Sequence, residues 1–388
     1  MNPFLSLKRV ELVLIALTCM LTAYGLLSIY AASALKGVEL YQQPQFFLKK
    51  QFIAVATGFF IIFVLYRIPF AWISHLTIPL VLLTIFSLGL IFVPGMYTKV
   101  GGALRWLKVS GIRIQPGELA KISLVFFLAK NLSRKNSNIN SLLRGLMPNF
   151  LVLGIFSFLL LRQPDFGTSA LLTVVTFLML YVAGISRKFL LVTCSIGGLA
   201  LLGIILAAPY RLKRILIFLD PWRNIQREGF QIVQSYLAFR NGGFWGVGLG
   251  SSKQKLFFLP EAHTDFILSV IAEESGFIGT TFVCISLLLL VACGGIITLS
   301  VRNRHQQFLA FGLTSLLAIQ ALFNIGVVMG MLPTKGIPLP FLSSGVSSLL
   351  VFFFVVGVLA RIGRESVRTQ ANAKTSDTSA YSQAAPHI

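Results

Sequence analysis

Long apolar segments constrain this chain more than any other feature of its sequence. A helix needs about 20 predominantly apolar residues to cross the hydrocarbon core of a membrane, and segments of roughly that length recur throughout the chain. They cover residues 10–34, 51–66, 70–93, 114–132, 147–161, 168–186, 189–208, 266–299, 308–331 and 344–362. We therefore predict an all-α, polytopic membrane protein of about ten transmembrane helices. The segment 266–299 is longer than a membrane requires, so its first turns are expected to project from the bilayer.

The composition agrees with a membrane environment. Charged residues make up 12% of the chain, 56% is hydrophobic, and the mean hydropathy is +0.83, whereas a soluble domain has about 25% charged residues. The net charge of +21 would suggest nucleic acid for a soluble protein. Here the basic residues lie between apolar runs, so membrane lipid headgroups or a phosphorylated substrate are the expected partners, and nucleic acid is not. The four cysteines all lie in apolar segments, which excludes a disulfide framework or zinc spacing.

Short basic turns predict the orientation of the chain. The connections at 186–188 and 301–304 carry Arg and Lys, and short loops of this kind favour the cytoplasmic side. Both termini are then cytoplasmic. The segment about 210–265, between the seventh and eighth predicted helices, becomes one long extracytoplasmic loop. Its own basic residues do not oppose this, because long loops translocate largely regardless of charge.

The two ends of the chain are expected to differ. The first apolar run follows Lys8 and Arg9 and, at about 25 residues, is too long for a cleavable signal peptide, so we expect it to remain as the first helix. Residues 1–362 are expected to form one membrane domain. Residues 363–388 are polar and rich in Ser, Thr, Ala and Gln, which predicts a disordered cytoplasmic tail.

Asp265 is the acidic residue best placed for chemistry. It immediately precedes the long apolar segment on the predicted outer side. It could cap that helix with Thr264, or act as a general base whose ionised form the helix dipole favours; the two roles are compatible. With Glu261 and His263 it lacks any standard metal-ligand spacing. The sequence requires no cofactor and leaves a divalent cation open.

Other acidic residues border the same predicted surface. Glu118 follows the helix-start sequence 115–117 and lies within pairing reach of Lys121, which favours a structural role when the motif is taken alone. Glu273 and Glu274 lie two turns into the long apolar segment. Carboxylates at membrane depth are costly and usually face a polar cavity. These two either shape such a cavity, pair with a cation, or make a polar contact between helices.

Two outer segments could bind an anion. Residues 241–250 are rich in glycine and are followed by Lys253 and Lys255; the spacing matches no nucleotide-binding loop. Their backbone N–H groups could hold a pyrophosphate, but a flexible turn against the membrane explains the composition as well. Lys335 lies in the stiff, proline-rich segment 332–341 and either reaches for the membrane interface or binds an anion.

Several motifs, in order along the chain, resemble the SEDS family (shape, elongation, division and sporulation), which includes FtsW and RodA. The resemblance extends from the first helix to about Ile362, and the motifs that carry it are 115–121, 162–168, 218–222, 229–235, 246–256, 259–266, 272–274 and 332–348. The amino-acid sequences of 260–265 and 332–336 are more similar to the division branch, typified by FtsW, than to the elongation branch. Gly117 departs from the family pattern, which usually has Ser there, and 344–348 departs from its usual Tyr-Gly-Gly-Ser-Ser.

The resemblance implies a peptidoglycan glycosyltransferase that polymerises lipid II, an undecaprenyl-pyrophosphate-linked disaccharide-peptide, outside the cytoplasmic membrane during division. The family's catalytic aspartate falls on Asp265. Substrate-binding roles are expected for Arg105, Lys255, Lys335, Glu118 and Glu273. The implied partners are a class B penicillin-binding protein, which is a transpeptidase, and other division proteins. The alternatives are a flippase or transporter of the lipid-linked precursor, an elongation-type polymerase, and a scaffolding division protein.

Overall fold

The computed structural model describes residues 3–100, 103–109, 112–134, 145–206, 217–224, 229–252 and 262–383. Within them the chain is mainly helical, with a three-stranded antiparallel sheet of order β1-β2-β3. The elements are α1 (Pro3–Tyr41), α2 (Phe46–Arg67), α3 (Phe70–His75), α4 (Thr77–Leu90), β1 (Tyr97–Val100), β2 (Ala103–Val109), β3 (Ile112–Ile114), α5 (Pro116–Leu132), α6 (Met147–Arg162), α7 (Phe166–Val182), α8 (Arg187–Leu206), η2 (Pro221–Asn224), α10 (Phe230–Gly242), α11 (Ile267–Ser300), α12 (Arg304–Val328) and α13 (Val346–Gln383).

A helix, or in one case a pair of helices, lies at every apolar segment found in the sequence. Among the described residues, six helices are long and apolar enough to cross a membrane, and Met147–Arg162 and Phe166–Val182 are shorter apolar helices. Large apolar side chains are exposed on these helices, for example Trp72 at 71% and Leu299 at 83%. The helices are therefore apolar outside as well as inside, as expected where lipid replaces water. The number that spans a membrane stays a prediction.

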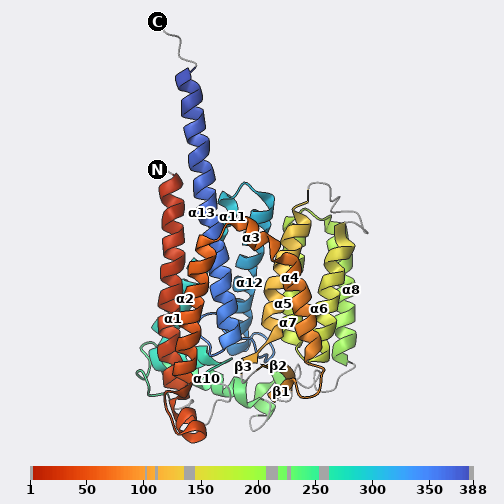
Figure 1. Ribbon diagram of the computed structural model, residues 1–388. Helices are drawn as coiled ribbons and strands as arrows, with labels where there is room; N and C mark the ends of the chain where they lie inside the picture. The colour runs from red at the N-terminus through yellow and green to blue at the C-terminus, as the bar shows by residue number, and fades with distance from the viewer. Residues whose placement is uncertain are drawn as a thin grey trace.

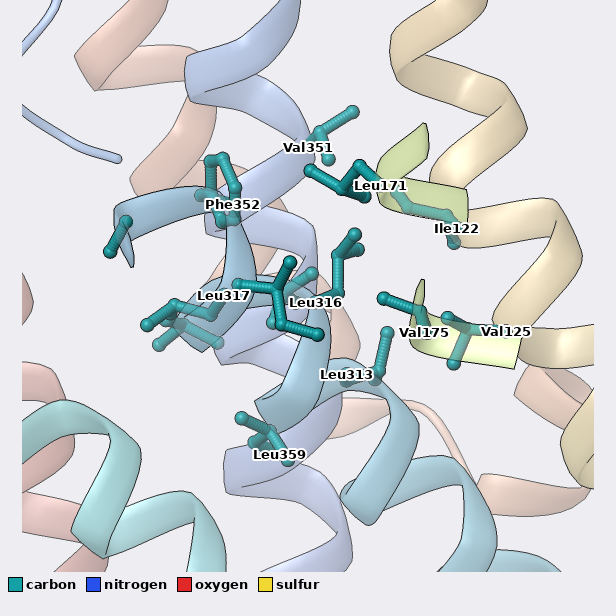
Figure 2. Packing of buried hydrophobic residues seen from close by; sticks show 14 of the residues in the cluster. Ile122, Val125, Leu171, Val175, Leu313, Leu316, Leu317, Val351, Phe352 and Leu359 are labelled. Atoms are coloured by element: carbon teal, nitrogen blue, oxygen red, sulfur yellow. The ribbon is translucent and has the colours of Figure 1, made fainter. Parts of the chain in front are cut away.

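The helices form a bundle whose two ends differ (Figure 1). The start of α1 and the end of α13 lie at one end of the bundle, and the sheet and α10 lie at the other. The core is continuous: α13 packs along α2, and α12 packs along α5, α7 and α11. Figure 2 shows where this core is filled by branched and aromatic side chains of α5, α7, α12 and α13, with Val125 and Val175 facing Leu313 and Leu316. This rigid core fixes the ends of its helices relative to one another.

Four parts of the structure differ from the sequence-based expectations. The predicted single helix 70–93 is divided between α3 and α4, because Pro79 lacks an N–H and its ring opposes the carbonyl of His75. The sheet and α10 occupy segments that were predicted to be extracytoplasmic loops. The segment 363–388, expected to be disordered, is helical as far as Gln383; no proline or glycine interrupts it between Arg364 and Gln383.

Helix α11 is broken nine residues after it begins. Gly276 has φ 63° and ψ −156°, which is not helical. The glycine-rich loop enters the break: Val247 N–H and Gly248 N–H donate to the carbonyls of Glu273 and Glu274, while Phe277 N–H donates to Gly243 O. Backbone groups that the break removes from the helix are thus paired with the loop. The break separates the first turns of α11, expected to project from the membrane, from the remainder of the helix.

Candidate active site

Asp265 lies where the chain enters α11. It is partly exposed. The N-cap position of α11 is the next residue, Phe266, whose side chain makes no capping hydrogen bond with the described residues, so the N-cap expected at Thr264 or Asp265 was placed wrongly. Its backbone carbonyl accepts a hydrogen bond from Asn324 Nδ2 at 2.8 Å. Asp265 is therefore held by its main chain at a helix N-terminus, where a negative charge is favoured.

Arg105 reaches the same region from β2. Its Nη2 donates to the Pro164 carbonyl at 2.6 Å and lies 3.9 Å from Asp165 Oδ1. Asp165 is the N-cap of α7, accepting from the Thr168 backbone N–H at 3.4 Å and from its hydroxyl at 2.7 Å. Because Asp165 is fixed in this way, it holds the guanidinium near the start of α7. The Arg105 side chain keeps 25% exposure and remains accessible to a ligand.

Gly336 is the point at which Asp265 and Arg105 come together. A Cβ added to Gly336 would lie 3.0 Å from Asp265 Oδ2 and 3.7 Å from Arg105 Nη1. These two side chains come from positions 160 residues apart in the sequence. A carboxylate and a guanidinium therefore border the backbone of the proline-rich segment, with no side chain at Gly336 to separate them.

Lys335 lies beside this pair, against the start of α7. Its Nζ is 3.6 Å from the centre of the Phe166 ring, and its Cδ would be 3.3 Å from a Cβ added to Gly167. The ring attracts the ammonium through its quadrupole, so the lysine is held on the protein. The structure thus brings together three of the predicted site residues, Asp265, Arg105 and Lys335.

Glu118 lies behind this site, in a buried polar chain. It receives a hydrogen bond from Lys121 Nζ at 2.6 Å, and Lys121 donates to Gln320 Oε1 at 2.7 Å. Gln320 Nε2 in turn donates to the Pro338 carbonyl at 2.9 Å. Both charged side chains are almost fully buried, so the pairing expected from their spacing is confirmed. The chain connects Glu118 with the proline-rich segment, and its predicted contact with substrate stays a prediction.

Two of the predicted site residues, Glu273 and Lys255, are not placed beside Asp265 in the part of the chain that the structure describes. The Glu273 carboxylate is buried and accepts from the Ser252 hydroxyl and from Asn241 Nδ2 at 3.4 Å. It thus pairs with the glycine-rich loop and with α10. Lys255 lies outside the described residues, as does Glu261, which was considered for a cation with His263 and Asp265.

Sequence reasoning assigned no role in the site to Asp165, Gln320 or Asn324. The helix-start position of Asp165 was visible in the sequence, whereas its approach to Arg105 depends on tertiary structure. Gln320 and Asn324 lie four residues apart and are the polar residues of α12 after Ser315. An amide pair at this spacing on one helix face is a signal that the sequence contained. The assembled site has one carboxylate able to take a proton and two cations able to stabilise an anionic leaving group.

Comparison with known proteins identifies the family. The sequence matches the FtsW/RodA/SpoVE family, described as cell cycle protein, over residues 11–368. It is 39% identical over 365 residues to the "probable peptidoglycan glycosyltransferase FtsW" of Geobacter sulfurreducens, covering 93% of this chain and 98% of that protein. It is 37% identical to the stage V sporulation protein E of Bacillus subtilis, covering 92% of this chain and 97% of that protein.

Solved structures share the fold. A chain of a peptidoglycan synthase complex that coordinates polymerization and crosslinking superposes with a TM-score of 0.76 at 27% identity, covering 91% of this chain and 97% of that chain. The rod shape-determining protein RodA of Thermus thermophilus has a TM-score of 0.66 at 24% identity, covering 91% of this chain and 96% of that chain. This chain is thus a multi-pass, mainly helical membrane protein, and it belongs to the FtsW/RodA/SpoVE family of cell cycle proteins.

Proposed function

We propose that this protein is a peptidoglycan glycosyltransferase that polymerises lipid II into glycan strands during cell division. The observation that carries the proposal is the convergence of the Asp265 carboxylate and the Arg105 guanidinium at Gly336. The relatives named peptidoglycan glycosyltransferase match almost the whole chain, which supports the same reaction here. The chemistry fits, because glycosyl transfer from a lipid pyrophosphate needs a base for the acceptor and positive charge for the leaving group.

The proposed reaction assigns one role to each side chain. Asp265 takes the proton from a sugar hydroxyl of the acceptor as its oxygen bonds to the anomeric carbon of the donor. The bond between that carbon and the donor's pyrophosphate oxygen breaks, and undecaprenyl pyrophosphate leaves with the bonding electrons. Arg105 and Lys335 stabilise the negative charge that develops on the pyrophosphate. Asp165 holds Arg105 in place through the 3.9 Å contact.

The proposal includes a membrane orientation and partners. The active site lies outside the cytoplasmic membrane, about ten helices cross the bilayer, and both termini are cytoplasmic. The basic turns at 186–188 and 301–304 support this orientation. A class B penicillin-binding protein is the proposed transpeptidase partner, because the related solved chain comes from a peptidoglycan synthase complex. Work at the division site with other division proteins follows from the similarity to FtsW.

Replacing Asp265 by Asn tests the proposal. Asn keeps the shape of Asp but cannot act as a base at neutral pH. General base catalysis contributes about 10²–10⁴-fold, so the purified Asp265→Asn protein, in complex with its transpeptidase partner, should fold normally and make almost no glycan from lipid II. Wild-type glycan synthesis by a well-folded variant would remove Asp265 from the mechanism. A flippase that needs this side chain only for its shape would still transport lipid II after the substitution.

A further inference from the structure

Asn324 of α12 holds together two segments that carry the candidate active site. Its Nδ2 donates to the Asp265 carbonyl at 2.8 Å and to the Ile337 carbonyl at 2.7 Å. The side chain is almost completely buried, with 1% exposure. One amide group therefore connects the residue that bears the carboxylate with the segment that contains Lys335 and Gly336.

The two contacts require this particular amide orientation. Both partners are carbonyl oxygens, so only the NH₂ group can face them, and each of its two hydrogens serves one carbonyl. Asn324 Oδ1 is buried and has no hydrogen-bond partner within the part of the chain that the structure describes. A buried acceptor left in this way costs about 1–3 kcal/mol. The Oδ1 atom of Asn324 thus lowers the stability of the fold, while the NH₂ group donates to both carbonyls at short distances.

Gln320 repeats the arrangement one helical turn earlier. Its Nε2 donates to the Pro338 carbonyl at 2.9 Å, next to the Ile337 carbonyl that Asn324 binds. Residues four apart lie on the same face of a helix. Two amides of α12 therefore bind two consecutive carbonyls and fix the position of the proline-rich segment along the helix. Asn324 differs from Gln320 in that it also binds Asp265.

We propose that Asn324 is a positioning residue for glycosyl transfer, and that it acts by fixing Asp265 relative to Gly336 and Lys335. The inference rests on the proposed role of Asp265 as the base. Asn324 itself does not contact the substrate and acts only through the position of Asp265. Its importance follows from the geometry that catalysis requires, since a misplacement of about 1 Å can cost roughly 10²-fold in rate.

The test compares two buried amides. Asn324→Leu removes both donors at similar size and should lower the initial rate of lipid II polymerisation roughly ten- to hundredfold. The matched control is Asn149→Leu, because Asn149 is also buried and donates to the Gly145 carbonyl at 2.8 Å, in α6 and away from Asp265. This control should polymerise near the wild-type rate. Both proteins are assayed in complex with the transpeptidase partner after their melting temperatures have been measured.

A double variant separates positioning from general stability. If Asn324 acts through Asp265, adding Asn324→Leu to Asp265→Asn leaves the residual rate of Asp265→Asn unchanged. A merely structural role would lower that residual rate further. Wild-type activity of Asn324→Leu, or additive effects in the double variant, would overturn the inference. Wild-type activity of the Asp265→Asn single variant would contradict the proposed base. That result comes from a separate protein, so failure of the base can be distinguished from failure of the positioning role.

A third substitution covers the case in which Asn324→Leu does not fold. Asn324→Ser retains one hydroxyl donor, which can serve one carbonyl at a time. Its rate should fall between those of the wild type and the Asp265→Asn variant, and the loss should again disappear in the Asp265→Asn background. A folded Asn324→Ser protein with wild-type activity would also overturn the positioning role.

Discussion

Gly336 lies so close to Asp265 that a Cβ added to the glycine would be 3.0 Å from Asp265 Oδ2. The same Cβ would be 3.7 Å from Arg105 Nη1. Ordinary van der Waals contacts between carbon and other heavy atoms are longer than the first distance. A side chain at this position would therefore push the carboxylate away from its observed place.

Gly336→Ala is expected to reduce polymerisation with little loss of stability. The added methyl requires the Asp265 carboxylate to move by a few tenths of an ångström. Because a misplacement of about 1 Å can cost roughly 10²-fold in rate, a smaller loss is expected from this shift. Gly345→Ala is the control within the same connection, because the nearest atom to its Cβ would be Ser348 Cβ at 3.9 Å. Rates from lipid II and melting temperatures should be measured for both. Equal rates for the two variants would refute the close approach at Gly336.

Lys335→Ala is expected to slow polymerisation, whereas Lys335→Arg should keep part of the activity because the positive charge is retained. One hydrogen bond to a charged group is worth about 1.5–3 kcal/mol, which corresponds to a roughly ten- to hundredfold loss of rate. Phe166→Leu serves as a control, because it removes the ring that lies 3.6 Å from the ammonium but keeps the lysine. Its loss of polymerisation rate should be smaller than that of Lys335→Ala. If Lys335→Ala is as active as the wild type, the lysine only reaches for the membrane interface.

Gly276→Ala is expected to destabilise the protein. The observed φ of 63° and ψ of −156° fall in a region that is essentially restricted to glycine and costs other residues about 1–3 kcal/mol, and a Cβ would lie 2.5 Å from Gly246 N. Gly295→Ala, in the same helix, is the control, because no atom would lie within 4 Å of its Cβ. Thermal unfolding in detergent should show a clearly lower melting temperature for Gly276→Ala and an unchanged one for Gly295→Ala. The same melting temperature for both variants would contradict the observed break.

The orientation can be tested with single cysteines in a background from which Cys19, Cys194, Cys284 and Cys293 have been removed. A cysteine at Ser251, after the glycine-rich loop, should react with a membrane-impermeant thiol reagent in intact cells. A cysteine at Ser186, in a basic turn, should react only after the membrane is opened. The opposite pattern would place Asp265 on the cytoplasmic side and exclude a reaction outside the membrane.

The helices of this protein could be located from the sequence because the requirement for about 20 apolar residues is local. The start of α5 at Pro116 was also a local signal, confirmed in the structure. The sheet was not predicted, because β3 spans only Ile112–Ile114 and its pairing with β2 depends on contacts outside the strand itself. Likewise α10 has weak apolar character, and its packing on α11 gives it a helical environment.

The candidate site could be predicted only residue by residue. The position of Asp265 before a long helix and the charge of Lys335 were visible in the sequence, but the approach of Arg105 to Asp265 joins two distant segments. No spacing rule connects residues so far apart. For Glu273 the sequence left three roles open, and one of them was a polar contact between helices. Its hydrogen bond from Asn241 of α10 agrees with that role.

The break at Gly276 also has a consequence for biosynthesis. An unpaired backbone group costs several kcal/mol in a lipid environment, so α11 can be accommodated in its broken form only when the glycine-rich loop supplies partners for Glu273, Glu274 and Phe277. The loop precedes α11 in the sequence and is therefore synthesised first. It is therefore already available when α11 emerges from the ribosome, so that the order of synthesis matches the order in which these hydrogen bonds must form.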